Sequence, residues 1–381
     1  MKTAFQAFFK QRTTWIGVGA AVMFQLVFGL VWMTGYDGVS DRMNELKAAI
    51  VADPQAAPIV QTLANQLPIE IVSMEQLQAA QDALQARDIQ MILHLQMVSN
   101  ADANGGAMPK IQLTTYINEA NASMLKSMMT SISAKVEEGL SHAQLQQAAA
   151  ASGNEALAAL LQSTSVDAQT VVLNEAGGMN RQMIPLMMVL ASYVGAMLMA
   201  LNLEQSAQAV APAIGRWRRF IVRVIMNLST AIVVSAFGTS LVALLGGAIS
   251  GGAWQLFAFQ TVLVAVFMFT AQMFVLLFGQ GGMVFNIILL SVQLVTSGAM
   301  VARPLLSNGY RVVSDWLPAT YGVDGIMNIL FGGTGTSADM SALLTIGLIV
   351  LIVGAAAVAI RRDHTSVEQS STLEAAPSTM S

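Results

Sequence analysis

The sequence has no cysteine and few charged residues. Only 10% of its 381 residues are charged, whereas 55% are hydrophobic. Soluble domains carry about a quarter charged residues, so this composition indicates a membrane protein. Without cysteine, the chain has no disulfides, thiol nucleophiles or thiolate metal ligands, and any domain outside the membrane must fold without covalent cross-links.

Several patterns that are typical of enzymes are also missing. No lysine follows a glycine, which excludes the Walker A loop that binds ATP phosphates, and neither G-x-S-x-G nor H-E-x-x-H occurs. His94, His142 and His364 lie far apart in the sequence, so a histidine metal site is not expected. The net charge of −4 argues against a nucleic-acid partner. We therefore expect no catalytic residues and no bound metal or cofactor.

Long apolar segments predict six membrane-spanning helices. Each has about 20 residues, enough to cross a hydrocarbon core of about 30 Å. The segments are residues 15–36, 183–203, 220–245, 254–278, 283–301 and 342–360. The first is predicted to be an uncleaved anchor, because it is too long for a signal-peptide core and no A-x-A site follows it. Before it, Phe5, Phe8 and Phe9 share one helical face, which favours an amphipathic helix at the membrane surface.

The distribution of arginine and lysine predicts the orientation of these spans. The segments expected inside the cell carry nine basic residues, whereas the short outer loops carry only Arg303 and Arg311. Because basic residues accumulate on the cytoplasmic side, both termini are predicted to be cytoplasmic. Residues 363–381 are rich in serine, threonine and glutamate and are expected to be disordered.

Residues 37–181 are predicted to form an extracellular α+β domain between residues 1–36 and a five-span domain at 182–362. They hold fifteen acidic and seven basic residues, and a long segment after one anchor is translocated largely regardless of charge. Alternating apolar residues predict that strands 89–98 and 111–117 pair as a hairpin. The other expected elements are a helical region at 39–67, a strand at 69–74, a helix at 75–87 opened by a capping box at Ser73 and Gln76, and helices at 118–151 and 154–174.

Residues 304–333 connect the last two predicted spans. They are too apolar for an ordinary loop, and proline and glycine interrupt them too often for one straight helix. Irregular backbone at membrane depth is tolerated only where it is buried in protein or lines a cavity. We therefore expect short outer or re-entrant helices packed on the bundle.

This connection contains the motif LPATYGVDGIMNILFGG, which includes Pro318, Tyr321, Asp324 and Gly325. The motif resembles the C-terminal part of ABC-2 type exporter permeases, most closely the YhgE/Pip (phage infection protein) branch. The arrangement of one span, a soluble domain and five further spans is similar to that class as well. The resemblance implies a non-enzymatic permease subunit in a bacterial plasma membrane. It also implies a second permease copy or paralogue and a separate ABC ATPase subunit, which would use ATP to drive outward transport.

Two groups of polar residues are candidate functional sites. In the resembling permeases, the cytoplasmic connection between the second and third spans docks into the ATPase, and here it carries Glu204, Arg216, Arg218 and Arg219. Anchoring on the cytoplasmic side is the alternative role for these arginines. On the fourth and fifth spans, Gln272, Asn286 and Gln293 are candidates for a translocation path at a dimer-interface cavity. Their alternative role is hydrogen bonding between helices.

Three other functions are alternatives to export. Ionisable residues are nearly absent from the centres of the spans, which argues against a proton-coupled transporter. A surface receptor or secretion scaffold of the YhgE/Pip type is the main alternative, although such proteins tend to have longer external domains. A membrane enzyme would require an acid, base or metal cluster, and Arg311, Asp315 and Asp324 form the only grouping of that kind in the sequence.

Overall fold

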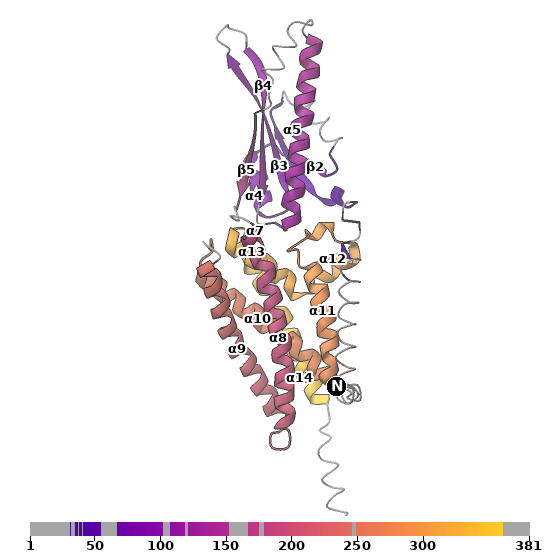
Figure 1. The fold of residues 1–381 in the computed structure, drawn as a ribbon, viewed down its shortest axis with the longest axis vertical. Helices are drawn as coiled ribbons and strands as arrows, with labels where there is room; N and C mark the ends of the chain where they lie inside the picture. The colour runs from indigo at the N-terminus through magenta and orange to yellow at the C-terminus, as the bar shows by residue number, and fades with distance from the viewer. Residues whose placement is uncertain are drawn as a thin grey trace, which may run out of the picture.

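The computed structural model describes most of the chain in two parts, a sheet domain and a helical bundle. It describes residues 31, 35–36, 38–39, 41–54, 67–101, 107–118, 121–151, 167–174, 179–245 and 249–360. The sheet domain comprises the described residues from 41 to 174, and the bundle comprises those from 179 to 360. Figure 1 shows the sheet domain stacked on one end of the bundle, so that the long axes of the two parts run roughly in line.

The sheet domain is built on one five-stranded sheet with the order β2-β1-β3-β4-β5. The strands are β1 (Lys47–Ala52), β2 (Glu70–Ser73), β3 (Met91–Ala101), β4 (Ala107–Asn118) and β5 (Asp167–Leu173). Strands β3 and β4 pair antiparallel, with Leu93 opposite Thr115, whereas the other neighbours are parallel. The predicted hairpin is thus confirmed, and so is the strand expected at 69–74.

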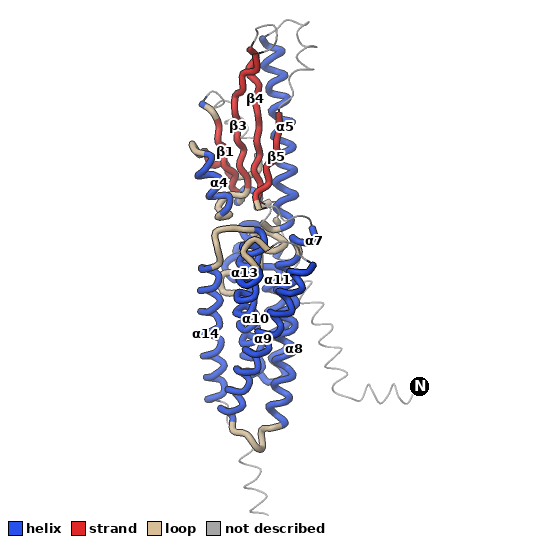
Figure 2. The backbone as a smooth tube through the Cα atoms, turned by 90° about the vertical axis from the view of Figure 1, so that its left-hand side faces the viewer, coloured by secondary structure: helices blue, strands red, loops and turns tan. Residues whose placement is uncertain are grey.

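Helices cover the two faces of this sheet (Figure 2). Helix α5 (Ser123–Ala151) packs Leu125 and Met129 against Leu93 on one face. Helix α4 (Leu77–Gln85) packs Leu84 against Ile92 on the other. The alternation of buried side chains along β3 therefore serves two cores, which explains why both sets of its residues are apolar.

Two predicted helical segments are strands instead. Residues 47–52 were expected to be helical, but they form β1, in which Ala48, Ala49, Ile50 and Val51 are all buried. A strand that is covered on both faces has a continuous apolar run, so the alternation that marks a strand is missing. The alanines in this run have a high helix propensity, which favoured the wrong prediction. Residues 167–173, expected at the end of a helix, form β5, where Thr170, Val171 and Val172 are β-branched residues that suit a strand.

The start of α4 also differs from its prediction. The expected capping box at Ser73 and Gln76 is wrong, because Ser73 ends β2 and the N-cap Gln76 makes no side-chain hydrogen bond to the helix. Strand pairing with β1 holds Ser73 in an extended conformation beside Ile50. Ser73 therefore belongs to the sheet, and Gln76 is the N-cap residue of α4.

The bundle contains the described segments that are suited to a membrane. Four helical stretches are long and apolar enough to cross one: Ile184–Ala209, Arg216–Leu244, Ala253–Thr296 and Ser337–Ile360. The third stretch comprises α10 (Ala253–Phe278) and α11 (Gly282–Thr296), joined by the turn η3 (Gly279–Gly281). The others correspond to α8 (Ile184–Ala209), α9 (Arg216–Leu245) and α14 (Ser337–Ile360).

The described bundle is that of an integral membrane protein, but it contains only part of the first predicted span. Of residues 15–36, only Val31, Gly35 and Tyr36 are described. The rest of this span, the predicted amphipathic helix at 1–13 and the predicted disordered tail at 363–381 lie outside the described residues. The total of six spans therefore remains a prediction.

Helix α10 lies at the centre of the bundle and contacts α8, α9, α11, α13 and α14. Its side chains are apolar and buried over most of its circumference, as expected for a helix surrounded by others. Helix α9 is the least covered. Of its most apolar stretch, 22% is buried within the chain, compared with 72% for the most apolar stretch of Ala253–Thr296. The exposed flank of α9 is thus available to lipid or to another chain.

The connection at 304–333 contains short helices, as predicted. They are η4 (Arg303–Leu305), α12 (Asn308–Ser314) and α13 (Pro318–Phe331). Pro318 occupies the first turn of α13, where its missing N–H costs least. Gly325 lies so close to the ring of Phe259 in α10 that a Cβ at this position would overlap it. The small motif residues of α13 therefore allow this helix to pack closely on the centre of the bundle.

Candidate functional site

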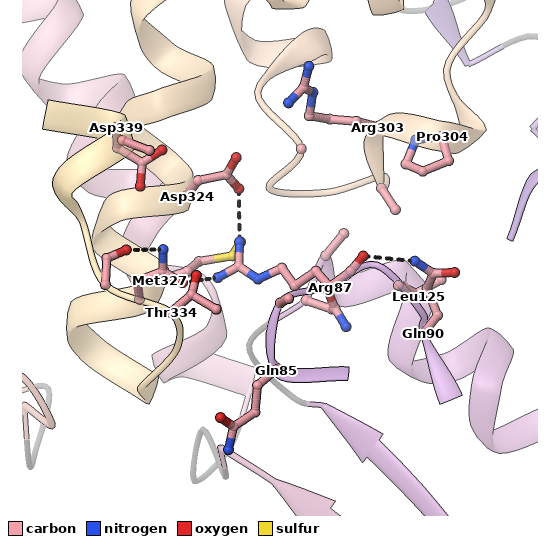
Figure 3. Close-up of a pocket in the computed structure, with 18 of the residues that line it drawn as sticks. Gln85, Arg87, Gln90, Leu125, Arg303, Pro304, Asp324, Met327, Thr334 and Asp339 are labelled. Atoms are coloured by element: carbon pink, nitrogen blue, oxygen red, sulfur yellow. Dashed lines mark hydrogen bonds and ion pairs between the residues drawn. The ribbon is translucent and has the colours of Figure 1, made fainter. Parts of the chain in front are cut away.

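A polar cavity lies where the sheet domain meets the bundle (Figure 3). Its volume is about 480 Å³, and its walls come from the turn after α4, the start of α5, the connection at 304–333 and the start of α14. Charged groups line it on both sides: Arg87 from the sheet domain, and Arg303, Arg311, Asp324 and Asp339 from the bundle. We call this region the junction cavity.

Arg87 makes two short side-chain contacts across the junction. Its Nη1 donates to Asp324 Oδ1 at 2.9 Å and its Nη2 donates to Asn328 Oδ1 at 2.7 Å, both in α13. Its backbone has φ of 64°, a left-handed conformation that is unusual for arginine. Gln90 supports this turn, since its Nε2 donates to the Arg87 carbonyl and its Oε1 accepts from the Lys47 N–H. The local structure thus directs the guanidinium into α13 despite the backbone strain.

The bundle side of the junction cavity presents two carboxylates to this one guanidinium. Asp324 and Asp339 lie on the same side of Arg87 in Figure 3. Asn328 links their helices, because its Nδ2 donates to the Gly335 carbonyl in the turn before α14. Burial raises the pKa of Asp324, and the nearby Arg87 and Arg303 act in the opposite direction. The arrangement can hold the sheet domain, α13 and α14 in one fixed geometry.

Other contacts reinforce the junction around this cavity. Arg42 Nε donates to the Leu305 carbonyl at 2.7 Å, and the Met124 N–H donates to the Met300 carbonyl at 3.2 Å. Leu305 also belongs to a buried apolar cluster that includes Leu125 of α5. A continuous apolar core across an interface resists independent motion of the two parts. The sheet domain is therefore joined to the bundle by apolar packing as well as by hydrogen bonds.

The far end of the bundle, opposite the sheet domain, holds the predicted ATPase-coupling residues (Figure 1). The prediction that Glu204 belongs to the loop is wrong: α8 continues to Ala209, and Glu204 is buried within it, with 3% of its surface exposed. Its Oε2 lies 2.8 Å from Arg223 Nη1 of α9, and its Oε1 accepts a bond from Gln208. Arg223 is only 7% exposed, because it is paired with Glu204 between the two helices.

The arginines of this end divide into anchoring and exposed groups. Arg219 Nη1 donates to the Ala207 carbonyl of α8, and Arg216 Nη1 donates to the Ala359 carbonyl of α14. Arg218 is exposed. The first two therefore tie α9 to its neighbours, and Arg218 is the one directed outward among the four predicted coupling residues.

Apolar side chains that were not predicted from the sequence also lie on this surface. Val210, Ile214 and Trp217 are exposed around the short connection at 210–215 and the first turn of α9. The sequence does contain a sign of this surface, because a tryptophan between arginines is unusual where the arginines only anchor a helix at the membrane surface. An exposed tryptophan beside an arginine is a common centre of protein–protein contacts. We call Val210, Ile214, Trp217 and Arg218 the far-end surface.

Comparison with known families identifies the architecture. A family model described as "ABC-2 family transporter protein" matches residues 13–359. The chain belongs to the ABC-2 transporter family. No curated protein and no solved structure shows significant similarity to the chain. The match spans the sheet domain as well as the bundle, so both parts are integral to this ABC-2 permease.

The predicted translocation residues of the ABC-2 permease are buried within one chain. Gln272, Asn286 and Gln293 are each less than 5% exposed. Asn286 accepts a bond from the Tyr193 hydroxyl and donates to the Ala271 carbonyl, both at 3.2 Å. Gln293 Oε1 accepts from the Ala319 N–H at the start of α13. Asn286 and Gln293 thus join helices through hydrogen bonds, which is the alternative role expected for them, and a translocation path at a dimer-interface cavity stays a prediction.

Gln272 occupies a different environment from the other two. It lies beside Asn227 and Arg223 around a small internal space between α9, α10 and α14. The side-chain amides of Gln272 and Asn227 are buried and have no hydrogen-bond partner within the described chain. Both amides thus lie in a polar group around Arg223, which is paired with Glu204.

The residues considered for a membrane enzyme are held in separate ion pairs, although Arg311 and Asp324 both line the junction cavity. Arg311 pairs with Glu45 at 3.3 Å, Asp315 pairs with Arg303, and Asp324 pairs with Arg87. Each of the three predicted residues therefore has a separate partner. Among the residues that the structure describes, no group of three histidine, aspartate or glutamate residues can hold a metal ion.

Proposed function

We propose that this chain is the membrane subunit of an ABC exporter, acting with a separate ATPase subunit and a second permease copy or paralogue. Membership of the ABC-2 family supports the permease role. The observation that carries the proposal is the far-end surface, an exposed connection between α8 and α9 that is fixed to both helices by buried charge pairing. When a partner subunit that binds this surface moves, α8 and α9 can move together with it.

Charge supports an orientation in which the far end is cytoplasmic. Arg216, Arg218 and Arg219 lie at this end, and Arg361 and Arg362 directly follow the end of α14. Basic residues accumulate on the cytoplasmic side. The sheet domain at the opposite end would then be extracellular, in the plasma membrane of a bacterium. Within the family we assign the chain to the YhgE/Pip branch, on the motif that contains Pro318, Tyr321 and Gly325.

The contacts within the bundle provide a route for the proposed movement. Glu204 and Arg223 join α8 to α9, and both helices pack on α10. Helix α10 packs on α13, whose Asp324 is bonded to Arg87 of the sheet domain. Closure of the ATPase pair would thus tilt α8 and α9, and the tilt would reach α13 and the junction cavity. Substrate would leave between the two permease halves, past the sheet domain.

The proposal is tested by co-purification from the native membrane in mild detergent. We expect a nucleotide-binding subunit to accompany the wild-type chain, and a Trp217→Ala, Arg218→Glu variant to lose it. Both changed residues are exposed, so the fold is preserved. The control is Lys135→Glu, an equal charge reversal on the exposed side of α5, which should retain the partner. If no ATPase accompanies the wild type, the export proposal fails and a YhgE/Pip-like receptor or secretion scaffold replaces it.

A further inference from the structure

A second cavity opens on the flank of the bundle between α8, α9 and α10. Its volume is about 640 Å³, within the range of pockets that bind small molecules. Most of its walls are apolar, including Met187, Met188, Phe237 and Leu241, and its polar groups are Ser192 and Gln260. Met187, Phe237 and Leu241 are exposed at the rim. The cavity is therefore a groove with a lateral opening, which we call the flank groove.

The backbone of α9 keeps this groove open. Gly238 lines it, and a Cβ at this position would lie 2.6 Å from Gln260 Nε2 of α10. Glycine therefore leaves room for the Gln260 amide in the wall. Gln260 Oε1 accepts a bond from Thr239 Oγ1 at 3.3 Å, which fixes the amide and leaves its N–H groups beside Gly238. The groove thus combines a long apolar surface with one oriented donor, a combination that suits a ligand with an apolar body and a polar linker.

The position of the groove indicates what covers it. Its walls belong to helices that are apolar enough to cross a membrane, in the half nearest the sheet domain. Gln260 lies seven residues after Ala253, the start of α10, and so about 10 Å along the helix. The rim is thus at the depth of lipid chains, and Gln260 is near the level where those chains join their polar groups.

The described residues of the first predicted span lie elsewhere. Val31 belongs to a buried cluster with Val295 of α11, and a Cβ at Gly35 would overlap the side chain of Val295. Figure 1 shows α11 on the side of the bundle away from α9. Among the described residues, those of the first predicted span therefore lie away from the opening, whose walls are helices apolar enough to cross a membrane.

We propose that the flank groove binds a hydrocarbon chain of an amphipathic molecule that enters sideways from the membrane. The chain lies along α8 and α9, and Gln260 Nε2 donates to an ester or amide carbonyl at its polar end. The proposal that the groove binds such a molecule depends only on the geometry of the groove. That such an amphiphile is the exported substrate rests on the proposed function, because export requires the ATPase partner.

The test uses the full-length protein in lipid nanodiscs that contain a phospholipid with a photoreactive diazirine in one palmitoyl chain. Peptide mapping after illumination locates the labelled residues. Gly238→Leu and Ala191→Phe narrow the groove from α9 and from α8, respectively. The control, Ser240→Leu, adds the same side chain to an exposed position of α9 that does not line the groove. We expect labelling at the groove in the wild type and the control, and a loss of about tenfold in both narrowing variants.

Three results would overturn the inference. Labelling spread evenly over the exposed side of α9 would indicate ordinary surrounding lipid. Equal labelling of all four proteins would show that the groove volume does not matter, and cross-links at Phe237 between two copies would make the groove a subunit interface. The two narrowing substitutions lie on different helices, so if one variant misfolds, the other still tests the groove. Labelling needs no ATPase, so the two proposals can fail separately. If the groove is labelled but no ATPase co-purifies, only the export proposal fails. If an ATPase co-purifies but the groove is not labelled, only the groove proposal fails.

Discussion

Arg87 of the sheet domain and Asp324 of α13 form an ion pair with 2.9 Å between Nη1 and Oδ1, although 237 residues separate them in the chain. Their side chains are 19% and 29% exposed, so the pair is neither fully solvated nor deeply buried. Exposed surface salt bridges contribute at most about 1 kcal/mol, and here the second bond from Arg87 to Asn328 adds a charge-assisted contact. The contact joins the only described sheet to the outer helices of the bundle and is the first feature to test.

We predict that Arg87 and Asp324 are energetically coupled. In a double-mutant cycle with Arg87→Ala and Asp324→Asn, thermal unfolding of the full-length protein in detergent should give a coupling of about 1 to 2 kcal/mol. Each single change should lower the melting temperature, since the remaining partner keeps its desolvation cost. Strictly additive effects would show that the two charges do not stabilise the junction.

The backbone of Arg87 permits a separate prediction. At φ of 64°, a residue with a Cβ is strained and glycine is not. Both Arg87→Gly and Arg87→Ala remove the guanidinium, so the glycine variant should be more stable than the alanine variant by about 1 kcal/mol. Chemical or thermal unfolding of the two variants measures this difference. At an ordinary helix C-terminal residue with negative φ, such as Ala86, glycine should instead be the less stable of the two.

Removing one partner of the Glu204–Arg223 pair should be strongly destabilising. Both residues are less than 10% exposed, and an unpaired buried charge typically costs about 3 to 5 kcal/mol. We expect Glu204→Ala to lower the melting temperature much more than the double variant Glu204→Met, Arg223→Met, which replaces the pair with apolar groups of similar size. If the double variant is as unstable as the single one, the loss of stability does not come from an unpaired buried charge, and this prediction is wrong.

His94 of β3 should make stability depend on pH. Burial lowers its pKa below the usual 6.5, and Asp53 partly opposes this shift. The folded state therefore binds a proton less readily than the unfolded state. Above pH 6.5 the residue contributes nothing, and below it stability is lost progressively until the pH reaches the lowered pKa. The melting temperature should fall less between pH 7.5 and 5.5 in His94→Gln than in the wild type, and parallel curves would contradict this expectation.

Close packing of α13 on α10 predicts a large effect of one methyl group. In Gly325→Ala, the added Cβ overlaps the ring of Phe259, and such overpacking costs about 1 to 3 kcal/mol. Phe259→Leu in the same chain should restore part of the loss, because it removes the overlapping atoms. Gly309→Ala in α12 is the matched control, since a Cβ there meets no atom within 4 Å. Similar melting temperatures for Gly325→Ala and Gly309→Ala would refute the packing argument.

The sequence by itself determined the class of protein and most of its local structure. Long apolar runs with almost no charge located the described spans, and the period-two alternation of 89–98 and 111–117 located the hairpin. Proline and glycine marked the breaks that divide 304–333 into short helices. These features depend on neighbouring residues and on the solvent around them, so they are readable without knowledge of distant contacts.

Tertiary structure decided which residues became partners. Residues 47–52 have a helical composition but form a strand, because β2 and β3 flank them and helices cover both faces. Glu204 reads as part of a polar loop but is buried, because α8 continues far enough to bring it to Arg223. Arg87 and Asp324 carry no local signal of their pairing. Burial and ion pairing depend on the distance between elements that are remote in sequence, and only the folded chain sets that distance.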